Sequence, residues 1–425
     1  MSGLLTGLHP VFALASIMVP FISTAADSAD FPPIMDSSDI AHFFSTDDID
    51  GLHWALTNVF RRSERNPEAS KVVHSLPPIV AARGGGSTYT TEYKLRLDLE
   101  QAEYLAENLE DGAEAVYFRD EVIPAYQRVL DNIPPLESLE RTGGLYGFQK
   151  ADVDAGILDL YNKALHVTDF DELRDVEGNV LSLLGDSFDS EAIQRRWFGE
   201  EPIGESCSNH PGIVVVDDIL SPLALSRIRQ LLQESTVWYQ TKMPLKFGGY
   251  AGAYIDDGLH DRILLQLAFE LHKSLPRIMK DHPLKYLWAY KYDSDYSGIN
   301  THADQAAVNV NLWVTPEESN LDKESGGLVV FTAKPPEGWD FEEYNTNTEK
   351  VMEVILGPTG FANVTVPYRE NRAVLFDSML FHHTDNFKFQ KGYTNRRINL
   401  TILYGDMKKG NNRNRLDGAS TKEEL

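Results

Sequence analysis

Two patterns of hydrophobic and polar residues divide the chain near its middle. In the first half, apolar residues recur at three- and four-residue steps over residues 99–130 and 155–167, the period that predicts α-helices. Pro124 lies inside the first stretch and is expected to kink or split it. Residues 27–206 are therefore predicted to be mostly helical, and paired helices of this size would also suit a helical-repeat module.

From residue 207 onward, short runs rich in β-branched and aromatic residues alternate with turn residues, which predicts strands. We expect strands at residues 212–216, 287–292, 307–315, 328–332, 373–377 and 397–405. Two helices are expected among them, over residues 221–234 and 260–280, the first with Ser221 as its cap. Many short strands favour a sandwich or jelly roll. The predicted fold class is therefore α+β, with a jelly roll over residues 207–408.

Both ends of the chain carry patterns typical of sorting signals. Residues 11–22, VFALASIMVPFI, are an apolar run followed by small residues, as in a secretory signal peptide, but shorter than the roughly 20 residues that span a bilayer. A packed or disordered segment is the alternative, because no Lys or Arg precedes the run. Residues 422–425, KEEL, resemble the endoplasmic reticulum retention tetrapeptide. We expect a signal peptide over residues 1–26 and a polar tail over 409–425. The expected location is the endoplasmic reticulum lumen or secretory pathway, with the cytoplasm as the alternative.

Composition excludes some classes of function. The 425 residues include 39 Lys and Arg against 64 Asp and Glu, which gives a formal net charge of −25. That charge repels phosphate backbones, so nucleic-acid binding is not expected. The single cysteine, Cys207, cannot form an intrachain disulfide, and Cys-rich zinc sites are excluded. No segment predicts a stable membrane span.

One short motif has the residue types of a metal site. His302 and Asp304 are two positions apart, so an extended backbone places both side chains on one face. His382, from a distant strand, would complete a set of two imidazoles and one carboxylate. Such a set leaves three adjacent positions of an octahedral metal open, and non-heme Fe(II) oxygenases use it. A His-x-Asp pair by itself is more often a surface feature, so the order of the remaining motifs decides its meaning.

The last predicted strand offers a candidate anion-binding residue. Arg397, Asn399 and Thr401 share one face of this strand, and the residues between them are apolar. A buried arginine needs an anionic partner, and the guanidinium fork matches a carboxylate in bidentate geometry. We therefore expect Arg397 to hold the carboxylate of a bound small molecule, with a structural salt bridge as the alternative.

With these motifs in order, residues 211–405 resemble the Fe(II)/2-oxoglutarate-dependent oxygenases, on the prolyl-4-hydroxylase-like branch. The matching segments are 302–304 (HAD), 326–331 (GGLVVF), 371–376 (NRAVLF) leading to His382, and 397–399 (RIN). The resemblance implies a double-stranded β-helix with Fe(II) held by His302, Asp304 and His382. It also implies 2-oxoglutarate held by Arg397, dioxygen as the second co-substrate, and ascorbate as an optional cofactor. The family has a hydroxyl residue two positions after the arginine, and Asn399 departs from that pattern.

Several neighbouring residues leave alternatives open. Tyr290 and Tyr292 precede the first histidine at about the distance where the family has a tyrosine that contacts the co-substrate; Tyr292 is our candidate, and a barrel-wall aromatic is the alternative. Asn309 and Asn311 share one face of a strand, where they would either line the cavity or form hydrogen bonds within the barrel wall.

Two pairs of adjacent residues compete for one role each. His382 and His383 cannot both point into the cavity from a strand, and the surrounding pattern favours His382 as the distal ligand. Arg396 and Arg397 alternate in the same way, and the strand face favours Arg397.

The expected function is hydroxylation dependent on Fe(II) and 2-oxoglutarate, with release of succinate and CO2. The branch and the retention-like tetrapeptide suggest a peptidyl prolyl residue, and hence a protein or peptide partner. A small-molecule hydroxylase is the alternative within the enzyme class. A non-catalytic jelly roll that binds a metal or another ligand is the alternative outside it.

Overall fold

The computed structural model describes most of the chain. The described ranges are 37–65, 88–110, 112–200, 210–241, 244–296, 298–336, 344–345 and 347–407. The expected signal peptide, the polar tail and Cys207 lie outside these residues. None of the helices in the described ranges is long and apolar enough to cross a membrane.

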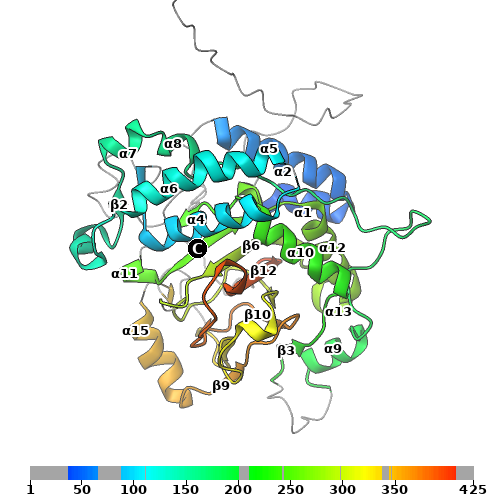
Figure 1. Ribbon diagram of the computed structural model, residues 1–425. Helices are drawn as coiled ribbons and strands as arrows, with labels where there is room; N and C mark the ends of the chain where they lie inside the picture. The colour runs from blue at the N-terminus through cyan, green and yellow to red at the C-terminus, as the bar shows by residue number, and fades with distance from the viewer. Residues whose placement is uncertain are drawn as a thin grey trace, which may run out of the picture. The chain divides into compact units, whose positions relative to one another are not determined.

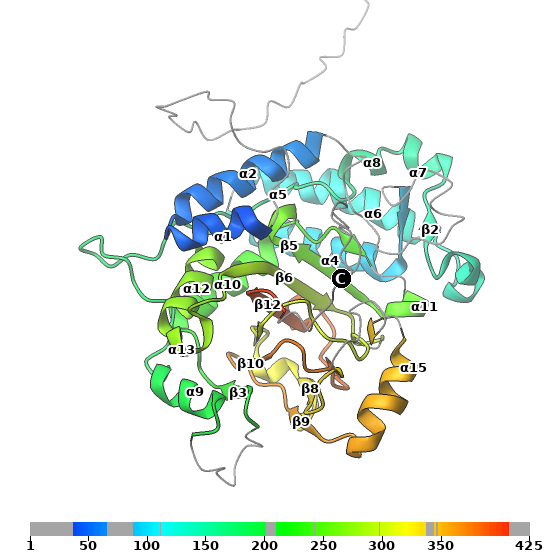
Figure 2. The same ribbon diagram turned by 180° about the vertical axis from the view of Figure 1, so that it is seen from behind.

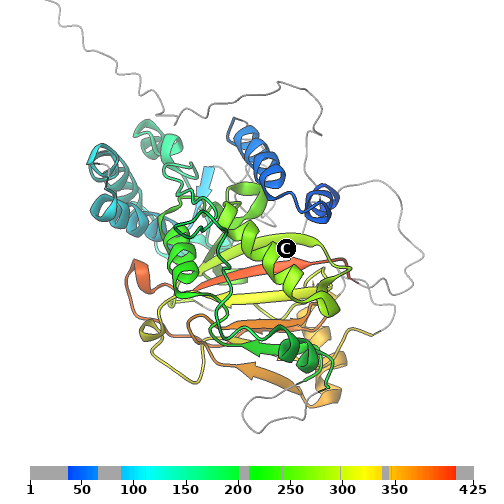
Figure 3. The same cartoon turned by 90° about the vertical axis from the view of Figure 1, so that its right-hand side faces the viewer.

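Seven antiparallel strands form the larger of two main sheets, in the order β3-β10-β7-β12-β6-β5-β4. Their bounds are β3 Ile213–Val216, β4 Gln240–Thr241, β5 Tyr250–Tyr254, β6 Leu284–Tyr292, β7 Val308–Trp313, β10 Ala373–Asp377 and β12 Ile398–Tyr404. Figure 3 shows the red β12 between β6 and β7, in the middle of the sheet. Central strands are paired on both sides, which fixes the side chains of β12 firmly.

The second main sheet has three strands, in the order β11-β8-β9. Their bounds are β8 Leu328–Phe331, β9 Asn363–Val366 and β11 His382–Thr384. The chain runs from β7 in the larger sheet to β8 and β9, returns to β10, crosses to β11 and returns to β12. This alternation between two antiparallel sheets is the connectivity of a jelly roll.

The alternation of side chains along each strand separates a polar interior from an apolar outer face. On β7, Val308, Val310 and Leu312 join the large core under the helices. Asn309 and Asn311 point to the opposite side, into the space between the sheets. After residue 207, the strands expected from the sequence are all present, and β4, β5, β9 and β11 are additional.

Helices α10 and α12 cover the outer face of the larger sheet. Their bounds are α10 Pro222–Glu234, α12 Arg262–Ser274 and, after a break, α13 Pro276–Met279. Ser221 caps α10, with its Oγ 3.3 Å from the Ala224 nitrogen. The single helix expected over residues 260–280 is two helices, because Pro276 cannot continue α12 and instead begins α13.

A short helical segment covers the smaller sheet. It consists of α15 Thr348–Lys350 and the π-helix η7 Val351–Leu356, seen beside β8 and β9 in Figure 2. Val351 and Leu356 pack with Val329 and Phe331 of β8 and with Phe381, which precedes β11.

The first half of the chain is helical only in part. Its helices are α1 Ser37–Ser45, α2 Ile49–Arg65, α4 Glu92–Asn108, α5 Gly112–Tyr117, η3 Phe118–Val122, α6 Ile123–Leu130, η4 Leu136–Thr142, α7 Lys150–Asp154, α8 Ile157–Leu160 and α9 Ser190–Trp197, and a strand pair joins β1 Tyr89–Thr90 to β2 Tyr146–Gly147. Figure 1 shows α4 and α6 packed side by side. Residues 112–130 are helical without interruption, so Pro124 does not split them; the wider turn of the π-helix η3 precedes it. The predicted stretch is divided earlier, where α4 ends and Leu109 has φ and ψ angles of −69° and 133°.

The helix expected over residues 155–167 is wrong beyond one turn. Only α8 forms, and Gly156 and Asn162 on either side of it have φ angles of 86° and 54°. Residues 161–189 contain no helix. The apolar residues in this stretch, including Ile157 and Tyr161, pack instead into a second core with α4 and α6. Their spacing reflects that packing and not a continuous helix.

The first prediction concerns the packing of α1 on the sheet. The Phe44 ring lies 4.1 Å from that of Phe269 on α12 and 6.4 Å from that of Tyr404 on β12. Phe44→Ala leaves a cavity there and should lower the free energy of unfolding by about 3–5 kcal/mol, measured by urea denaturation. Val176→Ala, at a side chain that is 97% exposed, should change it by less than about 0.5 kcal/mol. Equal effects of the two substitutions would contradict this packing.

Candidate metal centre

His302 and Asp304, in the segment before β7, lie together with His382 of β11. Their ligand atoms all lie within 4.8 Å of one another. Asp304 Oδ1 is 3.6 Å from His302 Nε2, and Asp304 Oδ2 is 3.4 Å from His382 Nε2. The two histidines are paired through their backbones in an antiparallel bridge, with N···O distances of 3.0 and 2.8 Å. This pairing joins the segment before β7 to strand β11 and fixes the spacing of the rings.

The hydrogen bonds of the two rings determine their tautomers. His302 Nδ1 lies 2.7 Å from the Asn300 carbonyl oxygen, and His382 Nδ1 lies 3.0 Å from that of Leu380. Because a carbonyl only accepts, each Nδ1 carries a proton in these hydrogen bonds. In the neutral rings, the lone pairs of both Nε2 atoms then face Asp304. Desolvation, followed by the neighbouring His382 ring, lowers the pKa of His302 to about 4, so that this ring is neutral at pH 7.

Asp304 supplies the negative charge of the cluster. Burial would raise the pKa of this carboxyl, but the pKa is lowered, because the His382 and His302 rings in their protonated form, and a hydrogen bond from Asn309, stabilise its negative charge. Asp304 is 2% exposed, yet its Oδ1 accepts no hydrogen bond. A buried carboxylate oxygen without a partner is costly. Two imidazole lone pairs and this oxygen converge on one point, which is the donor set that a divalent cation fits.

Three asparagines continue from Asp304 along the inner wall. Asn309 Nδ2 donates to Asp304 Oδ2 at 2.5 Å, and Asn311 Nδ2 donates to Asn309 Oδ1 at 2.6 Å. Asn399 Nδ2 then donates to Asn311 Oδ1 at 2.8 Å and to Thr401 at 2.9 Å. We call these residues, Asn309, Asn311 and Asn399, the asparagine ladder. The ladder lines the interior and bonds within the wall at once, so both interpretations of Asn309 and Asn311 hold.

The direction of the asparagine ladder affects what Asn399 can bind. Asp304 only accepts, so Asn309 must turn its amide nitrogen toward it, and each following amide is oriented in turn. Asn399 thereby uses its nitrogen within the wall and leaves Oδ1 buried without a partner. In this orientation Asn399 offers an acceptor and gives no donor to a carboxylate.

Arg397 is a buried cation without a carboxylate partner among the described residues. Its side chain is 1% exposed, with Nε donating to the Gly326 oxygen at 2.8 Å and Nη2 to the Gly327 oxygen at 3.1 Å, while Nη1 has no partner. Burial lowers its pKa. Gly327 itself packs closely against β9, because a Cβ there would lie 1.9 Å from the Val366 oxygen. The Nη1 amino group of the guanidinium, with its two N–H donors, is therefore available to a bound acceptor.

Aromatic rings surround this guanidinium. Its carbon lies 4.8 Å from the centre of the Tyr292 ring, 5.7 Å from that of Trp313 and 5.8 Å from that of Phe387. The backbone of Tyr292 also donates to the Arg397 oxygen at 3.0 Å. Tyr292 thus lies beside Arg397, whereas the hydroxyl of Tyr290 bonds to that of Tyr254 at 2.9 Å. Contact of Tyr292 with a co-substrate stays a prediction.

The competing members of each pair take other positions. His383 Nδ1 lies 3.0 Å from the Thr384 oxygen, its ring packs near Phe331, and it is absent from the metal-binding cluster. Arg396 binds Glu100 of α4 through two hydrogen bonds. Sequence reasoning did not identify Glu100, because it lies 296 residues from Arg396 and no local pattern links them.

The comparisons with known proteins give weak likenesses. No family model and no curated protein matches the chain. Among solved structures, the non-heme alpha ketoglutarate dependent epimerase SnoN from nogalamycin biosynthesis is 14% identical, with a TM-score of 0.34 over 51% of this chain and 83% of SnoN. HygX from Streptomyces hygroscopicus, solved with nickel, 2-oxoglutarate and hygromycin B, is 13% identical, with a TM-score of 0.31 over 46% of this chain and 83% of HygX. AviO1 from Streptomyces viridochromogenes Tue57 is 15% identical, with a TM-score of 0.32 over 53% of this chain and 97% of AviO1. The fold and the site described above therefore rest on this chain's own strands and side chains.

The second prediction tests the metal cluster directly. His302→Ala and Asp304→Ala each remove a ligand of the metal. Loss of a residue that only hydrogen-bonds to a ligand weakens metal binding roughly 10- to 100-fold, so the Kd for Ni(II) or Fe(II) should rise by more than that in these variants. Anaerobic isothermal titration calorimetry measures it. His383→Ala is the matched control and should stay within a few-fold of the wild type. Equal metal affinity in all three variants would mean that the metal does not bind at this cluster.

The third prediction concerns the asparagine ladder. Asn309→Ala removes the hydrogen bond that orients Asp304, so metal affinity should fall by roughly 10- to 100-fold while all three ligands remain. The same titration measures this change. Unchanged affinity would show that the backbone alone holds Asp304 in place.

Proposed function

We propose that this chain is an Fe(II)- and 2-oxoglutarate-dependent oxygenase. The observation that carries the proposal is the buried Arg397, which has an unpartnered Nη1 and no carboxylate partner among the described residues. Asp385 and the Tyr292 side chain partly offset the burial of this cation, but no described carboxylate lies within ion-pair distance of it. A buried cation in this situation is stabilised when an anion binds beside it. The interior of the same jelly roll holds the cluster of His302, Asp304 and His382, which suits a divalent metal. A molecule with a metal-chelating end and a distal carboxylate, such as 2-oxoglutarate, would meet both needs.

The chain's own residues would orient the reactants. The Nε2 atoms of His302 and His382 and the carboxylate of Asp304 would hold Fe(II), with the carbonyls of Asn300 and Leu380 fixing the two rings. When bound, Fe(II) with 2-oxoglutarate supplies the activation of dioxygen, and substrate hydroxylation is coupled to release of succinate and CO2. Arg397 would pair with the distal carboxylate, and Tyr292 would shield that ion pair from water.

For the substrate we propose a small molecule. This is the class of ligand that HygX holds in its solved structure, with hygromycin B bound. Hydroxylation of a peptidyl prolyl residue, the main expectation from the sequence, has no support from a described feature of this chain. Location in the secretory pathway stays a prediction, because the segments that suggest it lie outside the described residues.

The first test is formation of succinate from 2-oxoglutarate by anaerobically Fe(II)-loaded protein after exposure to oxygen. Wild type is compared with His302→Ala, with and without panels of small hydroxylatable molecules and proline-rich peptides. Turnover that requires His302 supports the oxygenase. Stimulation by peptides alone would overturn the choice of a small-molecule substrate. Absence of both turnover and 2-oxoglutarate binding in metal-loaded protein would overturn the proposal and favour a non-catalytic ligand-binding jelly roll.

The fourth prediction concerns Arg397. Arg397→Met keeps much of the side-chain volume but removes the cation, so the Kd for 2-oxoglutarate should rise about 30-fold or more, the effect of truncating one member of a buried charge pair. The melting temperature of Ni(II)-loaded wild type should rise when 2-oxoglutarate is added, and that rise should disappear in the variant. Differential scanning fluorimetry measures both proteins. An undiminished rise in Arg397→Met would show that the anion binds elsewhere.

A further inference from the structure

Each residue of the proposed co-substrate site has a neighbour on the opposite face of the larger sheet. Tyr292 and Arg397 face the interior, where the guanidinium lies against the tyrosine ring. Lys291 and Arg396, one position earlier in each case, point outward, because side chains alternate along extended backbone. The outward side chains lie against helix α4 and the loops beside it.

Arg396 is held by two carboxylates from different elements. Its Nε donates to Glu100 Oε2 at 2.6 Å, and its Nη2 donates to Glu100 Oε1 at 3.0 Å. Its Nη1 lies 3.2 Å from Asp293 Oδ2, just after β6. A bidentate pair fixes the plane of the guanidinium as well as its distance. Arg396 itself is 8% exposed, so little solvent competes for these contacts.

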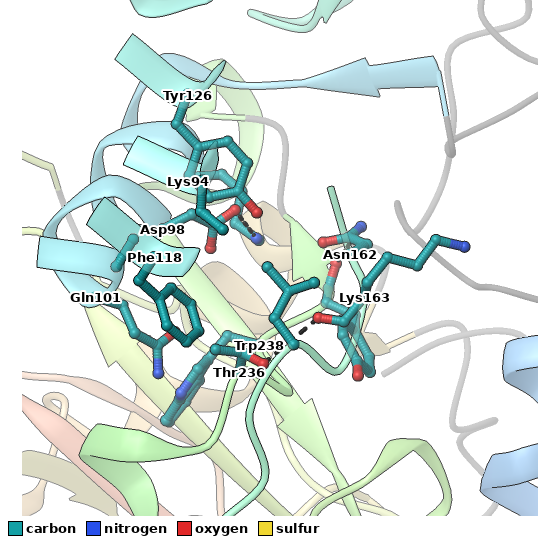
Figure 4. Close-up of a pocket in the computed structure, with 13 residues that line it drawn as sticks. Lys94, Asp98, Gln101, Phe118, Tyr126, Asn162, Lys163, Thr236 and Trp238 are labelled. Carbon is teal, nitrogen blue, oxygen red and sulfur yellow. Dashed lines mark hydrogen bonds and ion pairs between the residues drawn. The ribbon is translucent and has the colours of Figure 1, made fainter. Parts of the chain in front are cut away.

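Helix α4 is anchored to the same edge of the sheet along its length. The Tyr93 hydroxyl donates to the Tyr250 oxygen of β5 at 2.8 Å. Gln101 Nε2 donates to the oxygens of Gln233 and Ser235, each at 2.9 Å, at the end of α10. Figure 4 shows Gln101 of α4 close to Trp238. The helix therefore forms a fixed support from which Glu100 reaches Arg396.

Lys291, the outward-pointing lysine, contacts the segments that pack beside helix α4. Lys291 is fully buried, and its Nζ donates to the Leu232 oxygen at 3.1 Å and to the Tyr393 hydroxyl at 2.6 Å. Tyr393 begins the short helix η9, Tyr393–Asn395, which contacts α4 and ends immediately before Arg396. The segments that carry Tyr292 and Arg397 are thus both fixed by contacts on the outer face of the sheet, through Lys291 and Arg396.

We propose that Glu100, acting through Arg396, is a positioning residue for Arg397, so that helix α4 sets the affinity of the site for the distal carboxylate of 2-oxoglutarate. This inference rests on the function proposed above. Arg396 and Arg397 share a peptide bond, so a shift of the outward side chain moves the backbone from which the inward guanidinium extends. Thr315 Oγ1 also holds that backbone, by donating to the Arg396 oxygen at 2.8 Å. The contact with Glu100 therefore refines the position of the Arg397 guanidinium, which Thr315 and the sheet already hold approximately.

This positioning role differs from a purely structural one in what its loss affects. The Glu100 side chain is 24% exposed, and Arg396 keeps Asp293 when Glu100 loses its charge. Such a change should lower global stability only slightly. A small displacement of a binding group, in contrast, strongly weakens the contacts that depend on alignment.

The experiment compares Glu100→Gln with Glu107→Gln in the full chain loaded with Ni(II) under anaerobic conditions. Both substitutions remove one charge from α4, and Glu107 is on the exposed face of the helix. The Kd for 2-oxoglutarate, measured by calorimetry, should rise roughly tenfold in Glu100→Gln. It should not change in Glu107→Gln. The Kd for Ni(II) should be unchanged in both variants, because neither glutamate has a described contact with His302, Asp304 or His382.

A second variant separates alignment from charge. Arg396→Lys keeps the positive charge but loses the bidentate fork, so it should weaken 2-oxoglutarate binding about as much as Glu100→Gln. The double variant should be no weaker than either single variant, because both remove the same contact. If wild type binds no 2-oxoglutarate, the proposed function itself is wrong. If wild type binds it and Glu100→Gln has the same affinity, or if Glu100→Gln loses Ni(II) and 2-oxoglutarate affinity equally, the positioning role is wrong.

Discussion

A buried cation and a buried anion that do not pair with each other determine the chemistry of this interior. Arg397 and Asp304 are 1% and 2% exposed, and each retains a polar atom without a partner. The fold relieves this cost only in part. The carbonyls of Gly326 and Gly327 accept from the guanidinium, and Asn309 donates to the carboxylate. Dipoles of this kind satisfy a charge less well than a counter-ion does. The remaining imbalance is what makes the interior suited to a metal at one end and an anion at the other.

The asparagine ladder makes those two ends parts of one wall. Its first amide orients Asp304, and its last, on Asn399, lies two residues after Arg397. Since every amide is oriented by the one before it, the ladder has a single direction fixed by the carboxylate. In the oxygenase family that the sequence resembles, the hydroxyl residue two positions after the arginine can both donate and accept. Asn399, with its nitrogen engaged, only accepts, so in this chain the anion would depend more heavily on Arg397.

The parts of the site that follow from local periodicity could be predicted from the sequence. The two-residue spacing of His302 and Asp304, and the alternation that separates Arg397 from Arg396, are properties of extended backbone that any strand imposes. The helix expected over residues 155–167 was wrong because apolar spacing also arises where an irregular segment packs against two helices. The contact between Glu100 and Arg396 spans 296 residues and depends on where α4 docks. No local pattern carries that information, so it required the structure.

The packing of α4 and the other helices of the first half against the larger sheet also joins the two halves of the chain. One large core contains Phe44 and Leu52 from the first helices, Leu97 from α4 and Leu400 from β12. The outer face of the larger sheet is apolar and needs this cover. The helices that supply the cover also supply the outward contacts of the strands that carry Tyr292 and Arg397. In this chain, therefore, the burial that stabilises the sheet and the alignment of the anion-binding residue follow from the same packing.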